Sequence, residues 1–243
     1  MQLAAPSDIR RAYEAPATAA GYVERRFASE LNRLLHDRQV DVINRLFQRL
    51  RPRRSLEIAA GPGRITRDVR PTGTLVCVDY NESMIQHGRP ACDPNTRWVR
   101  GDGFQLPFQA CFDLVFSFRF VRHFRDADRQ RLYAEVRRLL VPGGTFVLDA
   151  VNDRVSAPLR RAHPEEYPIF DKCYQLPELR AELHAAGLEP IEIVPVQKYY
   201  PLQYRSQVWL GPRANWANRL IVRGLERLPW CDGLEWIVTC RRA

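Results

Sequence analysis

The chain has 243 residues, of which 45% are hydrophobic and 27% charged, and its formal net charge is +9. This length and composition suit one globular α/β domain with a sizeable core. No apolar run approaches the roughly 18 residues that a membrane span needs, so we expect no membrane insertion. The first residues lack the apolar segment of a secretory signal, and we therefore expect a cytoplasmic protein.

The positive charge comes almost entirely from arginines, which are scattered in short doublets along the chain. A dispersed pattern is typical of a solvated surface, although a basic surface also attracts nucleic acid or phosphorylated partners. The six cysteines include no CxxC pair and show no metal-ligand spacing with histidines. We expect structural thiols and no metal site.

The first two thirds of the chain alternate between helical and strand-like patterns. Residues 8–50 carry apolar residues at helical spacing, and Pro52 ends that segment because the residue before a proline avoids helical geometry. Strands are predicted over 55–59, 74–79, 97–101, 113–118 and 144–150. Several are almost continuously apolar, as expected of parallel strands covered on both faces. The alternation predicts a parallel sheet with right-handed crossovers.

The pattern loosens after Asp149. Residues 152–174 contain three prolines and are expected to form an ordered loop. The remaining predicted elements are a helix over 176–186 with Gly187 as its C-cap, and strands over 191–194 and 234–240. Residues 197–233 are rich in aromatic residues and arginines without a clear period, and we interpret them as an insertion.

A glycine turn, Gly61-Pro62-Gly63, follows the first predicted strand, and a helix is expected to start after it. Glycine tolerates positive φ and lets a ligand approach the backbone closely. The second strand ends at Asp79, where a doubly wound fold usually holds a ribose. Together they indicate a nucleotide-cofactor site. The dinucleotide fingerprint G-x-G-x-x-G is incomplete because Thr66 occupies its third small position, which disfavours a nicotinamide oxidoreductase.

Five segments in this part of the chain are informative through their order. They are LEIAAGPG at 56–63, DYNESM at 79–84, GDGFQLPF at 101–108, FDLVFS at 112–117 and VRRLLVPGG at 136–144. In this order and spacing they resemble the motifs of the class I S-adenosylmethionine-dependent methyltransferases, in particular the small-molecule group with a methyltransferase type 11 core. Three positions depart from that pattern: Ala59 replaces a glycine, Asn81 a serine and Gly103 an alanine.

The resemblance implies a fold and a cofactor. The fold would be an α/β, Rossmann-like, doubly wound sheet of seven strands in the order 3-2-1-4-5-7-6, with the last strand antiparallel and an N-terminal helical lid. The cofactor would be S-adenosylmethionine, with S-adenosylhomocysteine as product. A single methyltransferase domain would then divide into a lid (1–50), a cofactor-binding core (51–150) and substrate-side segments (151–243).

The cofactor site is expected around the strand ends. A carboxylate at Asp79 can accept hydrogen bonds from both ribose hydroxyls, and Asp102 is placed to accept from the adenine amino group. The plainer alternatives are that Asp79 caps a helix over 82–88 and that Asp102 is an ordinary loop acid. The resemblance and the strand positions together indicate the cofactor-binding candidates. In the core they are Glu57, Ala59, Gly61, Gly63, Asp79, Tyr80, Met84, Asp102, Gly103, Phe104, Ser117 and Phe118, and in the lid they are Tyr22 and Arg26.

Methyl transfer from a sulfonium is an in-line displacement, so the main task is to align the acceptor in a dry pocket. His123 follows the fourth strand and is the candidate base, because its ordinary pKa lies near neutrality; the alternative is a structural histidine. The candidate substrate-binding residues are Tyr13, Arg119, His123, Tyr167 and Tyr200. The aromatic insertion suggests an apolar or planar acceptor, or a second small core.

Two other functions remain as alternatives. A nucleic-acid-modifying methyltransferase would suit the charge, but the fourth strand ends at Ser117 and Phe118 without the Asn/Asp-Pro-Pro-aromatic corner that grips an exocyclic amino group. The second alternative is a protein with the same fold that binds S-adenosylmethionine without catalysing a reaction, since a fold does not guarantee an activity. We favour a methyltransferase with a small-molecule substrate.

Overall fold

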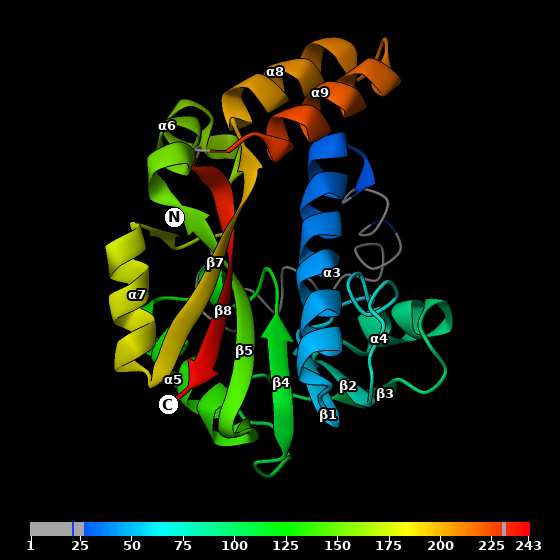
Figure 1. Ribbon diagram of the computed structural model, residues 1–243, viewed down its shortest axis with the longest axis vertical. Helices are drawn as coiled ribbons and strands as arrows, with labels where there is room; N and C mark the ends of the chain where they lie inside the picture. The colour runs from blue at the N-terminus through cyan, green and yellow to red at the C-terminus, as the bar shows by residue number, and fades with distance from the viewer. Residues whose placement is uncertain (1–20, 22–26, 230–231) are drawn as a thin grey trace.

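A single mixed sheet with helices on both faces forms the centre of the molecule (Figure 1). The computed structural model describes residues 21, 27–229 and 232–243. The candidates Tyr13, Tyr22 and Arg26 lie outside the described residues. The strands are β1 (Arg54–Ile58), β2 (Thr74–Asp79), β3 (Arg97–Arg100), β4 (Phe112–Ser117), β5 (Leu140–Asn152), β6 (Cys173–Tyr174), β7 (Leu188–Lys198) and β8 (Gly233–Arg242).

The strand order is β3-β2-β1-β4-β5-β8-β7, and β6 pairs with β5 outside this path. Strands β1 to β5 are parallel, whereas β8 runs antiparallel to both of its neighbours, β5 and β7. With the two-residue β6 set aside, this is the expected order 3-2-1-4-5-7-6 with an antiparallel last strand. The predicted fold class is confirmed, and β6 makes the sheet eight-stranded.

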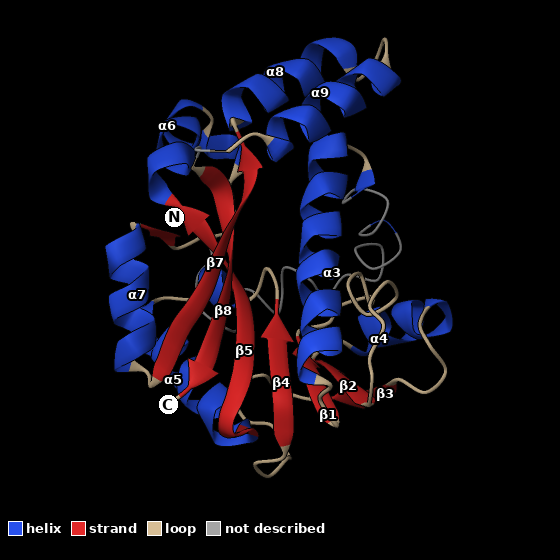
Figure 2. Ribbon diagram, viewed as in Figure 1, coloured by secondary structure: helices blue, strands red, loops and turns tan. Residues whose placement is uncertain are grey.

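Helices cover the sheet on two sides (Figure 2). They are α3 (Glu30–Leu50), α4 (Glu82–Gly88), α5 (Asp126–Leu139), α6 (Asp153–Ala162), α7 (Leu176–Ala185), α8 (Tyr200–Leu210) and α9 (Asn215–Arg227), with 3-10 turns at Arg89–Ala91, Val121–His123 and Pro164–Glu166. Ser29 caps α3 by accepting from the Asn32 amide at 3.2 Å. The helix ends at Arg51, which has a left-handed backbone, just before Pro52.

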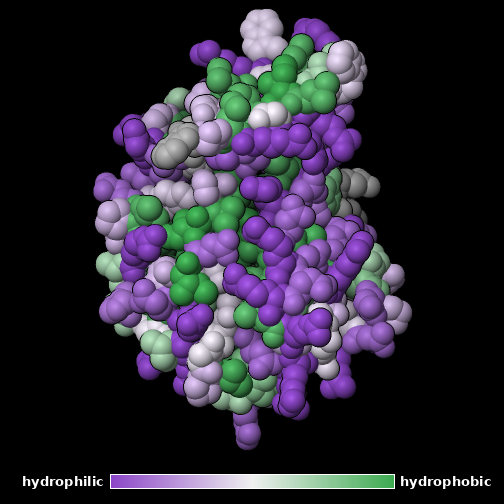
Figure 3. Space-filling view, in the orientation of Figure 1, coloured by the Kyte–Doolittle hydropathy of each residue, from purple (hydrophilic) through white to green (hydrophobic). Residues whose placement is uncertain are grey.

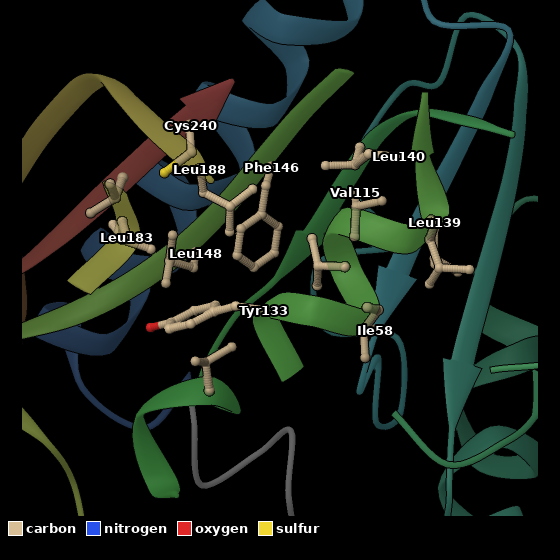
Figure 4. Close-up of a cluster of buried hydrophobic side chains, with 14 of the residues drawn as sticks. Ile58, Val115, Tyr133, Leu139, Leu140, Phe146, Leu148, Leu183, Leu188 and Cys240 are labelled. Carbon is tan, nitrogen blue, oxygen red and sulfur yellow. The ribbon is translucent and has the colours of Figure 1, made fainter. Parts of the chain in front are cut away.

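Successive residues of a strand point to opposite faces of the sheet, so the strands contribute side chains to two hydrophobic cores, one on each face. On one face, Tyr133 of α5 and Leu183 of α7 pack against strand residues such as Phe146 (Figure 4). On the other face, the apolar side of α3, including Phe47, packs on strand residues such as Phe116. These two layers hold the carboxyl ends of β1, β2 and β4 in fixed positions.

Two local predictions were wrong. The expected loop over 152–174 contains α6, whose N-terminus is capped by Asn152 through the Arg154 amide at 3.1 Å. Prolines suggested a loop there, yet Pro158 lies inside the helix. The helix expected after the glycine turn is a run of turns over residues 61–68.

The insertion over 197–233 is a helical hairpin formed by α8 and α9. The two helices were not recognised in the sequence, because the apolar residues of α8 follow no helical period. The side chains that the hairpin buries are mostly polar, among them Gln203, Ser206 and Asn218.

Candidate functional site

A cavity of about 130 Å³ lies at the carboxyl ends of β1, β2, β3 and β4. This is the edge at which doubly wound sheets bind ligands. Eleven of the candidate residues line it: Ala59, Gly61, Asp79, Tyr80, Met84, Asp102, Gly103, Phe104, Phe118, Arg119 and His123. Residues from several of the predicted motif segments, which are separate in the sequence, thus lie around one cavity.

The turn after β1 has a left-handed backbone at three of five positions, with φ of 58° at Ala59, 57° at Gly61 and 69° at Gly63. A Cβ on Gly61 would meet no atom within 4 Å, so the backbone there is open to a ligand. A Cβ on Gly63 would come within 2.7 Å of the Cys92 sulfur, and Gly63 is not among the cavity-lining residues. Gly63 therefore allows the turn to pack against its neighbours, whereas Gly61 faces free space.

Asp79 stands at the end of β2 and fixes the glycine turn. Its Oδ2 accepts from the Gly61 amide at 2.7 Å, and its Oδ1 accepts from the Asn81 amide at 2.8 Å. Burial raises the pKa of Asp79, while the backbone amides act in the opposite direction. Asn81, not Asp79, caps α4 by accepting from the amides of Ser83 and Met84. The cap alternative for Asp79 is therefore wrong. The Tyr80 amide also donates to this carboxylate, which leaves about one of its roughly four acceptor positions for a ligand.

The opposite wall of the cavity is aromatic. Asp102 accepts from the Phe104 amide at 3.1 Å, which orders the loop after β3. The ring of Phe104 meets that of Phe124 edge to face at 5.1 Å, and Phe124 meets Phe120 in the same way at 5.1 Å. Such T-shaped contacts hold rings in fixed orientations. A ligand in this cavity would lie between carboxylates on one side and rigid rings on the other.

Two candidates, Glu57 and Ser117, do not line the cavity but support it from behind. Glu57 is buried and accepts from the Thr66 hydroxyl at 2.6 Å; its burial raises its pKa to about 7. The Ser117 hydroxyl donates to the Ile58 carbonyl at 2.8 Å, which joins the ends of β4 and β1. Both residues position the strand ends instead of facing a ligand.

A second cavity, of about 490 Å³, shares Arg119 and His123 with the first. The predicted Tyr167 and Tyr200 both line it, together with residues of α3, α6, α8 and β8. The rings of Tyr200 and Tyr204 stack at 5.9 Å, and the Arg160 guanidinium lies 4.4 Å from the centre of the Tyr167 ring. This cavity is lined by flat aromatic surfaces, by cationic side chains, and by the acids Glu166, Asp171 and Glu235.

Beneath the second cavity lies a buried charge cluster that the sequence did not reveal. Arg122 is only 3% exposed, and its guanidinium lies 3.0 Å from Asp149, 3.2 Å from Asp171 and 2.8 Å from Glu235. Burial by itself would raise the pKa of both Asp171 and Glu235, but their cationic neighbours together, with Arg122 as the strongest, hold both below their ordinary values. The pKa of Asp149 is raised because burial dominates there. The three acids come from β5, β8 and the segment before β6, so no local motif signals the cluster.

His123 is oriented by this cluster. Its Nδ1 lies 2.8 Å from Asp171 Oδ1 and 3.0 Å from the Phe170 carbonyl oxygen. Both partners are acceptors, so Nδ1 carries a proton and the neutral ring keeps its lone pair on Nε2. Arg160 contacts the other oxygen of Asp171 at 2.6 Å and fixes that carboxylate in turn. A histidine held in this tautomer is able to accept a proton at a boundary shared by two cavities.

Comparison with known proteins agrees with this geometry. Residues 56–144 match the family model described as a methyltransferase domain. The chain is 33% identical over 123 residues to the ubiquinone/menaquinone biosynthesis C-methyltransferase UbiE of Pseudomonas fluorescens, which covers 45% of this chain and 46% of that protein. With UbiE of Pseudomonas savastanoi it shares 36% over 108 residues, covering 39% and 40%. The chain thus spans less than half the length of these curated relatives.

Solved structures share the fold at low sequence identity. Magnesium protoporphyrin IX methyltransferase of Synechocystis, determined with bound S-adenosylhomocysteine, has a TM-score of 0.68 at 10% identity and covers 98% of this chain and 100% of its own. The 1,6-didemethyltoxoflavin-N1-methyltransferase of Burkholderia thailandensis has a TM-score of 0.63 at 16% identity, covering 100% and 92%. The similarity extends across the whole architecture.

Proposed function

Because the chain belongs to the class I S-adenosylmethionine-dependent methyltransferases, whose cofactor is S-adenosylmethionine, we propose that it transfers a methyl group to a small-molecule acceptor. One observation supports this most strongly. A cavity with an open glycine turn and two strand-end carboxylates shares Arg119 and His123 with a second, aromatic cavity. Cofactor and acceptor would then meet at the shared residues, where alignment does most of the catalytic work.

The residues of the first cavity suit the cofactor chemically. We assign the ribose hydroxyls to Asp79, the adenine amino group to Asp102, and the adenine ring to the space between Tyr80, Met84 and Phe104. The open backbone at Gly61 would receive the methionine portion, since no side chain occupies that space. When bound, S-adenosylmethionine supplies an activated methyl group on its sulfonium sulfur.

Calorimetric titration with S-adenosylhomocysteine tests the cofactor assignment. Asp79→Ala is expected to weaken binding by about 1.5–3 kcal/mol, the range for hydrogen bonds to a charged group. Asp113→Ala is the matched control, because Asp113 also accepts two backbone amides, those of Arg53 and Arg54, yet does not line the cavity. Equal affinity of Asp79→Ala and the Asp113 variant, or tight NAD binding without a response to S-adenosylhomocysteine, overturns the proposal.

For the acceptor we propose a planar, ring-containing molecule with an ionisable hydroxyl. Stacked Tyr200 and Tyr204 offer flat apolar contacts, and Arg160 offers a cation next to the Tyr167 ring. The curated relatives are named as C-methyltransferases of ubiquinone and menaquinone biosynthesis, which is chemistry on such rings. A phenolic acceptor would give its hydroxyl proton to Nε2 of His123, which raises the electron density of the ring carbons next to that oxygen.

A panel of phenolic acceptors and their methyl ethers, assayed for S-adenosylhomocysteine release, tests the acceptor class. A phenol should turn over and its methyl ether should not, because the ether has no proton to lose. His123→Gln should lower kcat by about 100-fold or more while leaving S-adenosylhomocysteine affinity close to wild type. Equal turnover of phenol and ether would rule out the base role.

Nucleic acid is the alternative acceptor that the charge of +9 supports. Binding to nucleic acid through phosphate contacts falls steeply with salt concentration. A fluorescence titration with RNA at two salt concentrations therefore distinguishes the alternatives. We expect no steep salt dependence; a steep dependence together with methylation of the RNA would replace the small-molecule proposal.

A further inference from the structure

The hairpin of α8 and α9 has its apolar side chains on the outside. Seven large hydrophobic residues of these two helices are at least 40% exposed, and Trp209 (70%), Trp216 (73%) and Leu220 (67%) are the most exposed of them. Figure 3 shows hydrophobic side chains gathering over the hairpin at the top of the molecule. Single exposed apolar residues need no explanation, but a cluster of this size marks an interaction site.

The inner side of the same hairpin is polar. Gln203 donates to the Val222 carbonyl at 3.1 Å, Ser206 donates to Asn218 Oδ1 at 2.9 Å, and Asn218 donates to Gln207 at 3.1 Å. These side chains are buried between the helices, where water-soluble hairpins usually place apolar residues. A polar interior held by hydrogen bonds and an apolar exterior suit an element whose outer face meets an apolar medium.

The exposed face also carries unpaired positive charge. Arg205, Arg213 and Arg227 are exposed, and no carboxylate among the described residues lies within ion-pair distance of them. The one acid of the hairpin, Glu226, is buried and accepts from the Lys198 amide at 2.9 Å. Helices that lie in the headgroup region of anionic membranes have this composition: tryptophan and leucine next to arginine, with few acidic residues.

We propose that the α8–α9 hairpin docks this protein onto the surface of an anionic lipid bilayer. Trp209, Trp216 and Leu220 enter the headgroup region, and Arg205, Arg213 and Arg227 contact lipid phosphates. The hairpin lies in the interface and does not cross it: in the part of the chain that the structure describes, no helix has both the length and the apolarity to span a bilayer. Exposed arginines beside the apolar residues favour a surface of anionic phosphates over an uncharged apolar partner.

The hairpin also borders the second cavity, since Tyr200, Tyr204 and Gln207 of α8 line it. Tyr204 is 41% exposed and thus reaches both the cavity and the outer surface. If that cavity holds the acceptor, a point that rests on the proposed function, docking gives the acceptor a direct route from the bilayer and favours a lipid-soluble molecule.

Vesicle co-sedimentation, carried out without cofactor or acceptor, tests the docking independently of methyl transfer. The full chain should bind vesicles that contain anionic phospholipid, bind purely zwitterionic vesicles weakly, and be released partly by high salt. Trp209→Ser/Trp216→Ser/Leu220→Ser should raise the half-saturating lipid concentration by about tenfold or more. Arg205→Glu/Arg227→Glu, which leaves the apolar cluster intact, should do the same for anionic vesicles.

Leu50→Ser/Ile191→Ser is the matched control, because these residues are 42% and 43% exposed but lie away from the hairpin. It should bind vesicles like the unmodified chain, and circular dichroism should show all variants folded. Equal vesicle binding by the hairpin variants and this control overturns the proposal. A dimer that becomes a monomer in the triple variant, measured by light scattering, would assign the surface to a second copy and overturn it too.

Discussion

The two cavities are built in different ways. The first is formed mainly by backbone turns at the ends of adjacent strands, and its key acid, Asp79, contacts residues within about twenty positions along the chain. The second is formed by side chains from α3, α6, α8, β8 and the loop before β6. Its central charge cluster joins Arg122 to Glu235, 113 positions away. A site built from backbone turns depends on local chain geometry, whereas a site built from side chains depends on the assembly of α3 with the C-terminal half of the chain.

This difference predicts which substitutions are costly and where. The largest effect is expected in the charge cluster of the second region. Arg122→Met should lower the free energy of unfolding by about 3–5 kcal/mol, because it leaves buried carboxylates without their shared cation. Arg131→Met, which breaks the exposed pair with Asp128, should cost no more than about 1 kcal/mol. Urea unfolding measures both, and similar losses in the two variants would contradict the importance of the cluster.

A pH-dependent effect is expected behind the first cavity. Burial raises the pKa of Glu57 from 4.5 to about 7, so the folded protein binds this proton more tightly than the unfolded chain does. The stabilising contribution is complete below about pH 4.5 and is lost as the pH rises to about 7. Relative to Glu57→Gln, the chain should lose about 3 kcal/mol of stability across that range and change little above it. Urea unfolding of both proteins over this pH range measures the difference, and parallel pH profiles would show that folding does not shift the pKa of Glu57.

Packing around the glycine turn allows a smaller test. A Cβ on Gly88 of α4 would come within 2.3 Å of the Pro62 backbone, so Gly88→Ala should push the turn away and cost about 1–3 kcal/mol. Gly224→Ala in α9 meets no atom within 4 Å and should gain about 0.5–1 kcal/mol through helix propensity. Thermal unfolding of the pair should therefore shift in opposite directions. If Gly88→Ala instead raised the unfolding temperature, the glycine turn would be able to move away from the added methyl group without a loss of stability.

The smallest effect concerns the position where alanine replaces the glycine of the motif. Ala59 has φ of 58°, a left-handed conformation that costs a residue with a Cβ about 1–2 kcal/mol. Ala59→Gly should stabilise the fold by about 0.5–1 kcal/mol after the extra chain entropy of glycine is subtracted. Thermal unfolding measures this increase in stability. Calorimetry should show that the variant binds S-adenosylhomocysteine with an affinity within about twofold of that of the original chain. A destabilised Ala59→Gly would indicate that the methyl group contributes packing.

The same contrast explains what could be predicted from sequence. The strand over 74–79 was predicted with its observed ends, and eleven candidate residues line one cavity, because strand ends, glycine turns and caps are set by neighbouring residues. Asp171, Asp149 and Glu235 were missed, since only the folded sheet brings them to Arg122 and His123. The hairpin of α8 and α9 was missed because the apolar residues of α8 follow no helical period, whereas those of α9 do but face outward and mark no core.

The position of β8 has a consequence for how the protein is synthesised. β8 follows β7 in the chain, yet it lies between β5 and β7 and is the strand through which β7 joins the sheet. During translation β7 must therefore wait without a sheet neighbour until residues 233–242 leave the ribosome, while β1 to β5 already have their partners. β8 also delivers Glu235 to Arg122. A chain interrupted before residue 233 therefore retains the strands of the cofactor cavity and lacks the strand that completes the acceptor side.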